Sequence, residues 1–281
     1  MADSPPTPRP LEDRVLWEVD GAIGRVTINA PEQGNALSWD MRDRITALLE
    51  EASADLRVRA VILTGTGPRH FCTGAHLGGP KAGAPPRPEG APDRATGDAA
   101  RMIRRGWQRL IAAVLDCEKP VIGAINGAAA GGGAQLAIAC DFVLLADTAR
   151  IIEVFVRRGI LPDAGGAYLL PRIVGSHKAK ELLLLGEDVS AADALRLGIA
   201  MQVVPPDALA GAADEVAAKL LALPTKALSM TKWLVNRSFE SSRHTAFEEE
   251  AYAQELVTTS VDAAEGMRAF AERREPTFVG W

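Results

Sequence analysis

Two short stretches of small residues are candidates for binding a ligand through main-chain amides. Gly131, Gly132 and Gly133 precede a run of good helix formers, although glycine costs about 1 kcal/mol relative to alanine at a helical position. Glycines before a helix leave backbone N–H groups uncovered, and the helix dipole favours an anion there. Residues 73–75, Thr-Gly-Ala, also follow an apolar run. Two such turns are what an oxyanion hole with two amide donors requires.

Phosphate binding and simple packing are the alternatives for the triple glycine. A phosphate-binding loop ends in Gly-Lys-Ser or Gly-Lys-Thr, and a dinucleotide-binding loop has the pattern G-x-G-x-x-G. Residues 126–141, NGAAAGGGAQLAIACD, contain neither motif. Close packing of the following helix against a strand would also use glycines and needs no ligand. The second turn at residues 73–75 favours oxyanion binding over packing alone.

The position of Asp163, in the stretch LPDAGG (161–166), fits an acid–base group and a helix cap equally well. A single carboxylate suffices for a 1,3-proton shift, because it can take a proton from one carbon and return it to another. Burial beside Phe155 and Leu161 is expected to raise its pKa. The structural alternative is that Asp163 caps the helix that follows. His76, beside the second turn, is interpreted as a surface or supporting histidine, with a proton shuttle as the alternative.

Composition excludes several classes of function. The 281 residues carry a formal net charge of −5 and no basic block, so nucleic acid is not an expected partner. The three cysteines are an odd number without metal-type spacing, which predicts no metal site and a reduced, cytoplasmic location. The first ten residues are polar and proline-rich, and no apolar run is long enough to span a membrane.

The order of the expected elements indicates an α/β protein with a largely parallel sheet. Residues 14–19 and 24–29 alternate apolar and polar side chains around a turn, which predicts a β-hairpin. Residues 60–65 form an apolar run typical of a strand buried on both faces. Helices and strands then alternate to residue 206. Helices are expected at 38–55 (capped by Ser38), 99–117, 165–175 and 178–186, with one after the triple glycine, and strands at 120–125, 141–147, 149–154 and 200–204.

The chain is expected to have three parts: a disordered start (1–10), an α/β core (11–206) and a helical segment (207–281). The last part contains no strand candidate, and its apolar faces are more than one small subdomain can hide. Docking on a neighbouring subunit is therefore expected. Within it, Lys226 and Lys232 are placed on a solvated helix face, with phosphate contact as the alternative.

From about Leu16 to Trp281, the sequence resembles the crotonase, or enoyl-CoA hydratase/isomerase, superfamily. The resemblance implies a spiral of repeated ββα units with a C-terminal helical trimerisation segment. It also implies homotrimers or hexamers (dimers of trimers) and acyl-CoA thioester substrates, with no cofactor because coenzyme A is part of the substrate. The motifs that carry it are PEQGNALS (31–38), GTGPRHFCTGAHL (65–77), KPVIGAINGAAAGGGAQLAIACDF (119–142), RRGILPDAGGAYLLPRIVG (157–175), AADALRLGIAMQVVP (191–205) and EGMRAFAERREPTF (265–278).

The resemblance also assigns roles to residues. It places the thioester carbonyl between the amides of Ala75 and Gly132. The substrate pocket is expected to include Gln135, Phe155, His76, Leu77 and Ala36. The proline- and glycine-rich residues 78–98 are expected to form a lid-like loop that shapes the acyl pocket together with the segment around Trp107.

The two glutamates of the hydratases align with Gln135 and Phe155, and neither side chain can exchange a proton near neutral pH. An acid does stand at the isomerase position, Asp163, so the predicted function is an enoyl-CoA isomerase that shifts a C=C bond through a thioester enolate. Other chemistry of the superfamily is the alternative: hydratase, hydrolase, dehalogenase or lyase, acting through a base such as His76, or through Asp163 and a water. An inactive CoA-binding or assembly protein is the alternative of another class.

Overall fold

The computed structural model describes residues 9–76, 88–92 and 95–281, which form two sheets and the helices around them. A six-stranded sheet has the order β1-β2-β3-β5-β7-β10, and a four-stranded sheet has the order β4-β6-β8-β9. The strands are β1 Val15–Asp20, β2 Ile23–Ile28, β3 Ala60–Gly65, β4 His70–Cys72, β5 Val121–Ile125, β6 Ala128–Ala130, β7 Phe142–Ala146, β8 Arg150–Ile152, β9 Asp188–Ser190 and β10 Gln202–Val204. The helices are α1 Leu11–Arg14, α2 Trp39–Ala54, α3 Asp98–Ile103, α4 Arg109–Asp116, α5 Gly132–Ile138, α6 Gly166–Leu185, α7 Ala191–Arg196, α8 Leu209–Leu221, α9 Thr225–Arg237, α10 Arg243–Thr258 and α11 Val261–Glu272.

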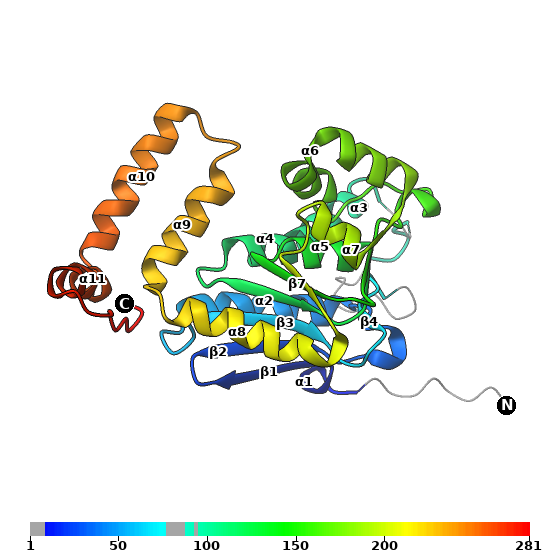
Figure 1. The fold of residues 1–281 in the computed structure, drawn as a ribbon. Coiled ribbons are helices and arrows are strands. Elements are labelled where there is room, and N and C mark those ends of the chain that lie inside the picture. Colours follow the sequence, from blue (N-terminus) through cyan, green and yellow to red (C-terminus); the bar gives the residue numbers. More distant parts are fainter. Residues whose placement is uncertain (1–8, 77–87, 93–94) are drawn as a thin grey trace.

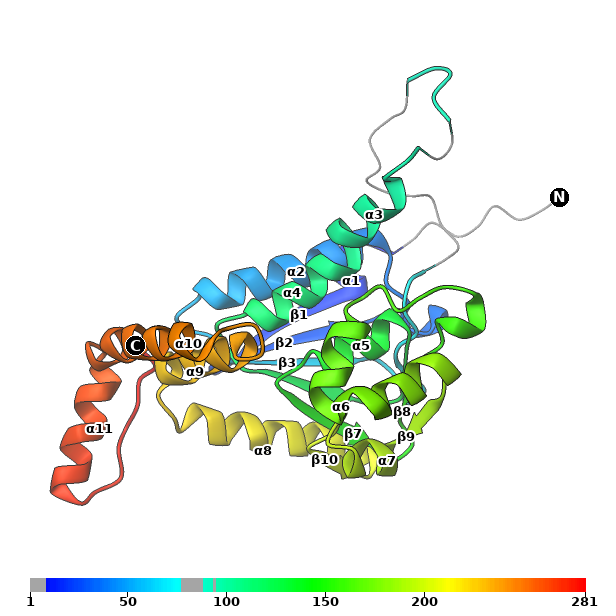
Figure 2. The ribbon, with the colours of Figure 1, turned by 90° about the horizontal axis from the view of Figure 1, so that it is seen from above.

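The six-stranded sheet lies between two layers of helices. In Figure 2, α2 and α4 cover one face of the sheet and α8 runs along the other. Every residue of β5 is buried, as expected for a strand covered on both sides. The apolar positions of α2, including Ile45 and Leu48, belong to the same core as the strands. The sheet is parallel from β2 to β10, and the predicted α/β class is confirmed.

Most predicted elements of the core are confirmed, with local differences. The hairpin is the antiparallel pair β1–β2. Ser38 precedes α2 at the N-cap position, but its hydroxyl donates to the Asp40 carboxylate instead of accepting from a helix amide, so it does not cap through its side chain. The two helices expected on either side of Gly175 are joined in α6, and the positive φ of Gly175 (77°) marks the break between them.

Of the four C-terminal helices, α8 belongs to the core, whereas α9, α10 and α11 lie beside it. Helix α8 packs on β3, β5 and β7 and contributes six buried apolar residues to the core. Helices α9, α10 and α11 form an arm beside the core in both views (Figures 1 and 2). The boundary expected at residue 206 stays a prediction, and residues 1–8 of the expected disordered start lie outside the described part of the chain. Among the described helices, none has an apolar run long enough to cross a bilayer.

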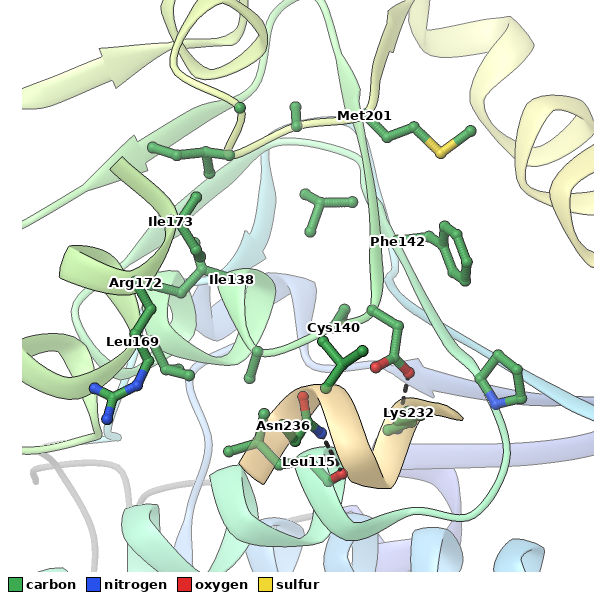
Figure 3. A pocket seen from close by; sticks show the side chains of 18 of the residues that line it. Leu115, Ile138, Cys140, Phe142, Leu169, Arg172, Ile173, Met201, Lys232 and Asn236 are labelled. Carbon is green, nitrogen blue, oxygen red and sulfur yellow. Dashed lines mark hydrogen bonds and ion pairs between the residues drawn. The ribbon is translucent and has the colours of Figure 1, made fainter. Parts of the chain in front are cut away.

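Helix α9 meets the core across a cavity of about 550 Å³ with a largely apolar lining. Figure 3 shows Lys232 and Asn236 of α9 at this cavity, with Asn236 Nδ2 donating to the carbonyl oxygen of Leu115 at 2.9 Å. Lys232 Nζ lies 2.7 Å from the Asp141 carboxylate and donates to the carbonyl oxygen of Val114 at 2.9 Å. The Lys232 side chain is only 9% exposed, so the solvated helix face expected for it is wrong. This ammonium joins α9 to the core.

Replacing Lys232 by methionine is expected to lower the free energy of unfolding. Methionine keeps the apolar stem but leaves the Asp141 carboxylate without its cation, and loss of hydrogen bonds to a charged group costs about 2 kcal/mol. Urea denaturation of the wild type and Lys232→Met measures the loss. Lys219→Met, on the exposed side of α8, is the matched control. Equal stability of Lys232→Met and the control would show that the ion pair does not hold α9.

Candidate active site

The two turns of small residues lie side by side because the strands before them are neighbours. Strands β4 and β6 pair in parallel, with His70 opposite Ala128. The turn after β4 contains Gly74, whose φ is +95° and where an added Cβ would lie 3.5 Å from the amide nitrogen of Gly132. Gly132 is the first residue of α5, so its N–H has no partner within the helix. Among the described residues, the N–H of Ala75 donates no backbone hydrogen bond.

Each residue of the triple glycine has a separate structural reason. Gly131 precedes α5 with a φ of +54°, which other residues rarely adopt. A Cβ on Gly132 would lie 2.5 Å from the indole ring of Trp107, and a Cβ on Gly133 would lie 2.0 Å from the carbonyl oxygen of Cys72. The packing alternative is therefore correct for Gly133, which lies against the strand before the other turn. Packing and amide exposure are both satisfied by the same three glycines.

Asp163 is half-buried and does not have the structural role considered for it, capping of the helix that follows. Helix α6 begins after Gly165 and has no side-chain cap, so the alternative that Asp163 caps this helix is wrong. Burial raises the pKa of its carboxyl, opposed by its own backbone N–H and by the positive charge of Arg42. Leu161 is 70% exposed, so it does not provide the burial expected of it. The carbonyl oxygen of Asp163 accepts a hydrogen bond from Gln108 at 3.4 Å, which places this segment beside the one that carries Trp107.

Gln135 has a buried partner that the sequence analysis missed. Its side-chain nitrogen donates to both carboxylate oxygens of Glu153, at 3.0 and 2.9 Å. Gln135 is 0% exposed and Glu153 is 1% exposed. Burial raises the pKa of Glu153 to about 7, although the hydrogen bond from Gln135 opposes the shift. A glutamate inside the apolar strand run ARIIEVF (149–155) was the available signal, because an acid within such a run is costly unless it is paired.

The side-chain oxygen of Gln135 has no hydrogen-bond partner among the described residues. The backbone of Gly166 lies against this amide, since a Cβ there would approach the Gln135 oxygen to 2.8 Å. Gln135 thus contacts the first residue of α6, three positions after Asp163. Gln135 is enclosed by protein and has no exposed surface.

The remaining expected pocket residues have mixed surroundings. Phe155 is 6% exposed and contacts the turn at Gly131. Ala36 is 7% exposed. His76 is half-buried, and its backbone N–H donates to the carbonyl oxygen of Leu37 at 3.1 Å. Leu77 lies outside the described residues, as does most of the expected lid loop.

The expectations of no metal and no cofactor stay predictions. Within residues 9–76, 88–92 and 95–281, no group of three or more His, Cys, Asp and Glu side chains is placed to hold a metal ion. The three cysteines are unpaired and buried, and burial raises the pKa of Cys72 to about 12. A thiol with such a pKa stays protonated, so Cys72 is not a nucleophile at neutral pH.

Two adjacent amide turns with a half-buried acid nearby agree with what the sequence comparison finds. Residues 18–280 match the family described as Enoyl-CoA hydratase/isomerase. The chain belongs to this family. The recognition made from the motifs is thus confirmed, and with it the crotonase-type fold.

Members of the family with high similarity carry different activities in their names. The chain is 34% identical to the 1,2-epoxyphenylacetyl-CoA isomerase of Escherichia coli, over 95% of this chain and 98% of that protein. It is also 34% identical to the short-chain-enoyl-CoA hydratase of Clostridium acetobutylicum, over 94% and 96%. The crystal structure of an enoyl-CoA hydratase from Bacillus anthracis superposes with a TM-score of 0.84 at 31% identity, covering 95% of this chain and all of that one. The chain is therefore an enzyme of the enoyl-CoA hydratase/isomerase family.

Replacing Glu153 by glutamine is expected to stabilise the protein at alkaline pH only. Because the native Glu153 holds a proton up to about pH 7 that the unfolded chain releases near 4.5, stability falls as the pH rises through this window and levels off above it. The difference between these two pKa values corresponds to about 3 kcal/mol in the free energy of unfolding. Relative to the wild type, Glu153→Gln should therefore gain stability at pH 8 and change little near pH 4.5, as measured by urea denaturation across this range.

Glu187→Gln is the matched control, because Glu187 is exposed and its carbonyl oxygen accepts the backbone N–H of Glu153. The control should show no such pH-dependent gain. A Glu153→Gln variant that is less stable than the wild type at pH 8 would contradict the raised pKa of the buried acid.

Proposed function

We propose that the protein is an enoyl-CoA isomerase that moves a C=C bond along the acyl chain of a CoA thioester. The amides of Ala75 and Gly132 hold the thioester oxygen and stabilise the enolate. The Asp163 carboxylate removes a proton from one carbon and returns it to another. The observation that carries the proposal is Asp163 itself: a half-buried acid with a raised pKa that does not cap helix α6 and forms no ion pair with any described residue.

The raised pKa of Asp163 suits a group that must both accept and release a proton, because proton transfer is most efficient when the pKa approaches the working pH. The oxyanion turns lower the pKa of the carbon acid by stabilising the enolate, and each amide donor contributes about 3 to 4 kcal/mol. A proton shift needs no water, so a site with a single acid that removes and returns the proton is sufficient for the reaction.

Hydration by a pair of glutamates is disfavoured by the residues present. The position that aligns with the first glutamate holds Gln135, whose side-chain nitrogen donates to the Glu153 carboxylate. The position that aligns with the second glutamate holds Phe155. Glu153 is an acid near this position, but it is 1% exposed and lies behind Gln135. Hydratase, hydrolase and lyase activity remain the second candidates, since relatives named hydratase share about a third of the sequence. An inactive CoA-binding protein would have no need of Asp163.

Asp163→Asn is expected to lose isomerisation of a 3-enoyl-CoA to its conjugated 2-enoyl isomer. Asparagine has nearly the same shape but cannot carry the proton, and loss of a general acid–base group costs about 100- to 10,000-fold in rate. Conjugation is followed by absorbance, and products are identified by mass spectrometry. Binding of the CoA thioester, measured by calorimetry, should be retained.

Asp207→Asn, on the exposed turn before α8, is the matched control and should keep wild-type activity. If the wild type yields only hydrated products and Asp163→Asn is as active, the isomerase assignment is wrong. Tight thioester binding without turnover of any 3-enoyl-CoA or 2-enoyl-CoA would favour the binding-protein alternative.

The homotrimer or hexamer implied by the family resemblance is part of the proposal. Helices α10 and α11 carry large apolar side chains that are mostly exposed. They include Phe247, Tyr252, Leu256, Met267 and Phe270, between 60% and 84% exposed. So many exposed apolar side chains on one arm are typical of a protein–protein interface.

Phe270→Glu is expected to weaken this assembly, because a charge in a packed apolar interface loses its hydration without gaining a partner. Light scattering after size exclusion should give at least three times 29.8 kDa for the wild type and a smaller mass for the variant. Leu56→Glu, an exposed apolar residue outside the arm, is the control. A wild type that elutes as a monomer at micromolar concentration would contradict the assembly.

A further inference from the structure

Glu153 and Gln135 are buried polar side chains that join segments of the candidate site. Glu153 follows β8, whose last residue, Ile152, accepts the N–H of Gly131 on its carbonyl oxygen at 3.0 Å. Gln135 lies one turn into α5, the helix that begins with the proposed oxyanion donor Gly132. The side-chain nitrogen of Gln135 donates to both carboxyl oxygens of Glu153. The pair therefore ties the end of β8 to the helix that carries this donor.

The same Gln135 amide packs against the start of α6. A Cβ added to Gly166, the first residue of α6, would lie 2.8, 2.9 and 3.0 Å from the oxygen, carbon and nitrogen of the amide. Because the three distances are nearly equal, the amide presents its flat face to Gly166. Asp163 lies three residues before Gly166. A shift of the Gln135 amide would therefore move the segment that carries the acid.

One proton on Glu153 satisfies every polar atom of the pair. Without it, the carboxylate has only the Gln135 nitrogen as a donor among the described residues, and the Gln135 oxygen has no donor at all among them. With it, the carboxylic acid O–H can donate to the amide oxygen while the amide N–H donates to the other carboxyl oxygen. Buried polar atoms without partners are costly, so the protonated pair is the better-satisfied arrangement.

The charged groups around Glu153 are engaged elsewhere or exposed. Arg157, four residues further along, is paired with Asp188 of β9. The carbonyl oxygen of Glu187 accepts the N–H of Glu153, but its side chain is exposed. Asp163 lies in the segment before α6, and neither α5 nor the first turn of α6 carries a charged residue. Burial therefore decides the protonation of Glu153, and it raises the pKa of this carboxyl to about 7.

We infer that Glu153 is a positioning residue: its carboxyl group, paired with the Gln135 amide, fixes the start of α6, and with it Asp163, relative to the amide of Gly132. The pair acts without touching the substrate, because neither side chain is more than 1% exposed. The inference rests on the proposed function, in which Asp163 exchanges a proton with an enolate held at Gly132. Ionisation of Glu153 removes the O–H donor of the pair, so the activity depends on its protonation.

The pH dependence of isomerisation in Glu153→Gln tests this inference. Glutamine has both a donor and an acceptor, so it can form two hydrogen bonds with the Gln135 amide at any pH. The wild-type kcat/KM for a 3-enoyl-CoA should rise as Asp163 ionises and fall again above about pH 7. Glu153→Gln should match the wild type at pH 6 and lack the fall. At pH 8 it should exceed the wild type about 10-fold, because a group with a pKa of about 7 is only about one-tenth protonated there.

Glu153→Leu, which offers neither a donor nor an acceptor, should lose about 10- to 100-fold in kcat at pH 6, since a small displacement of a catalytic group has a cost of this order. Its calorimetric affinity for the saturated thioester hexanoyl-CoA should stay close to that of the wild type, because the turn before α5 keeps its own contacts with β4 and β8. Glu187→Gln, whose side chain is exposed next to β9, is the matched control and should keep the wild-type pH profile.

An identical fall in activity above pH 7 in Glu153→Gln and the wild type would overturn the inference alone. Wild-type kcat in a folded Glu153→Leu, or an equal loss in both variants at every pH, would also overturn it. Circular dichroism at each pH shows whether the variants are folded, and if Glu153→Leu is not, the profile of Glu153→Gln decides. A wild type that isomerises no 3-enoyl-CoA would overturn the proposed function and this inference together.

Discussion

The parallel pairing of β4 with β6 is the contact on which the site depends. Each strand has only three residues, yet each ends in a turn of small residues, and pairing places the two turns next to each other. Gly133 makes this possible, because its missing side chain lets α5 begin against the carbonyl of Cys72. A larger residue there would push the two turns apart. The amides then lie close together without any side chain having to position them.

Under the proposed function, the side chains around these amides disfavour hydration by two glutamates and leave one acid, Asp163, for proton transfer. The positions that the family resemblance aligns with the hydratase glutamates hold the ring of Phe155 and the amide of Gln135, which donates to Glu153. Asp163 keeps partial access to solvent, and burial raises the pKa of its carboxyl. Under the proposed function, the two amides stabilise the enolate and Asp163 alone exchanges protons with it.

The surroundings of this acid are also electrostatically balanced. Burial favours the neutral carboxyl of Asp163, and the positive charge of Arg42 favours the carboxylate. Arg42 is itself held by Trp39 and Trp107, and Trp107 covers Gly132. Trp107 thus contacts both Gly132 and the guanidinium of Arg42, whose charge also acts on Asp163. These contacts join α2, the π-helical turn Arg104–Gln108 and α5, which are far apart in the sequence.

The sequence by itself determined the class of fold, the two amide turns and the position of the acid, because these depend on local features: apolar strand runs, glycines before a helix, and motifs at fixed spacing. The triple glycine and Asp163 were found this way. Arg42 and Glu153 were not, because the contacts that enclose them include Trp107 and Gln135, which are 65 and 18 residues away along the chain. Whether Ser38 or Asp163 caps a helix, and whether Lys232 faces solvent, was likewise decided only by the tertiary structure. In each case a side chain chooses among several hydrogen-bond partners or solvent, and that choice depends on what the folded chain places beside it.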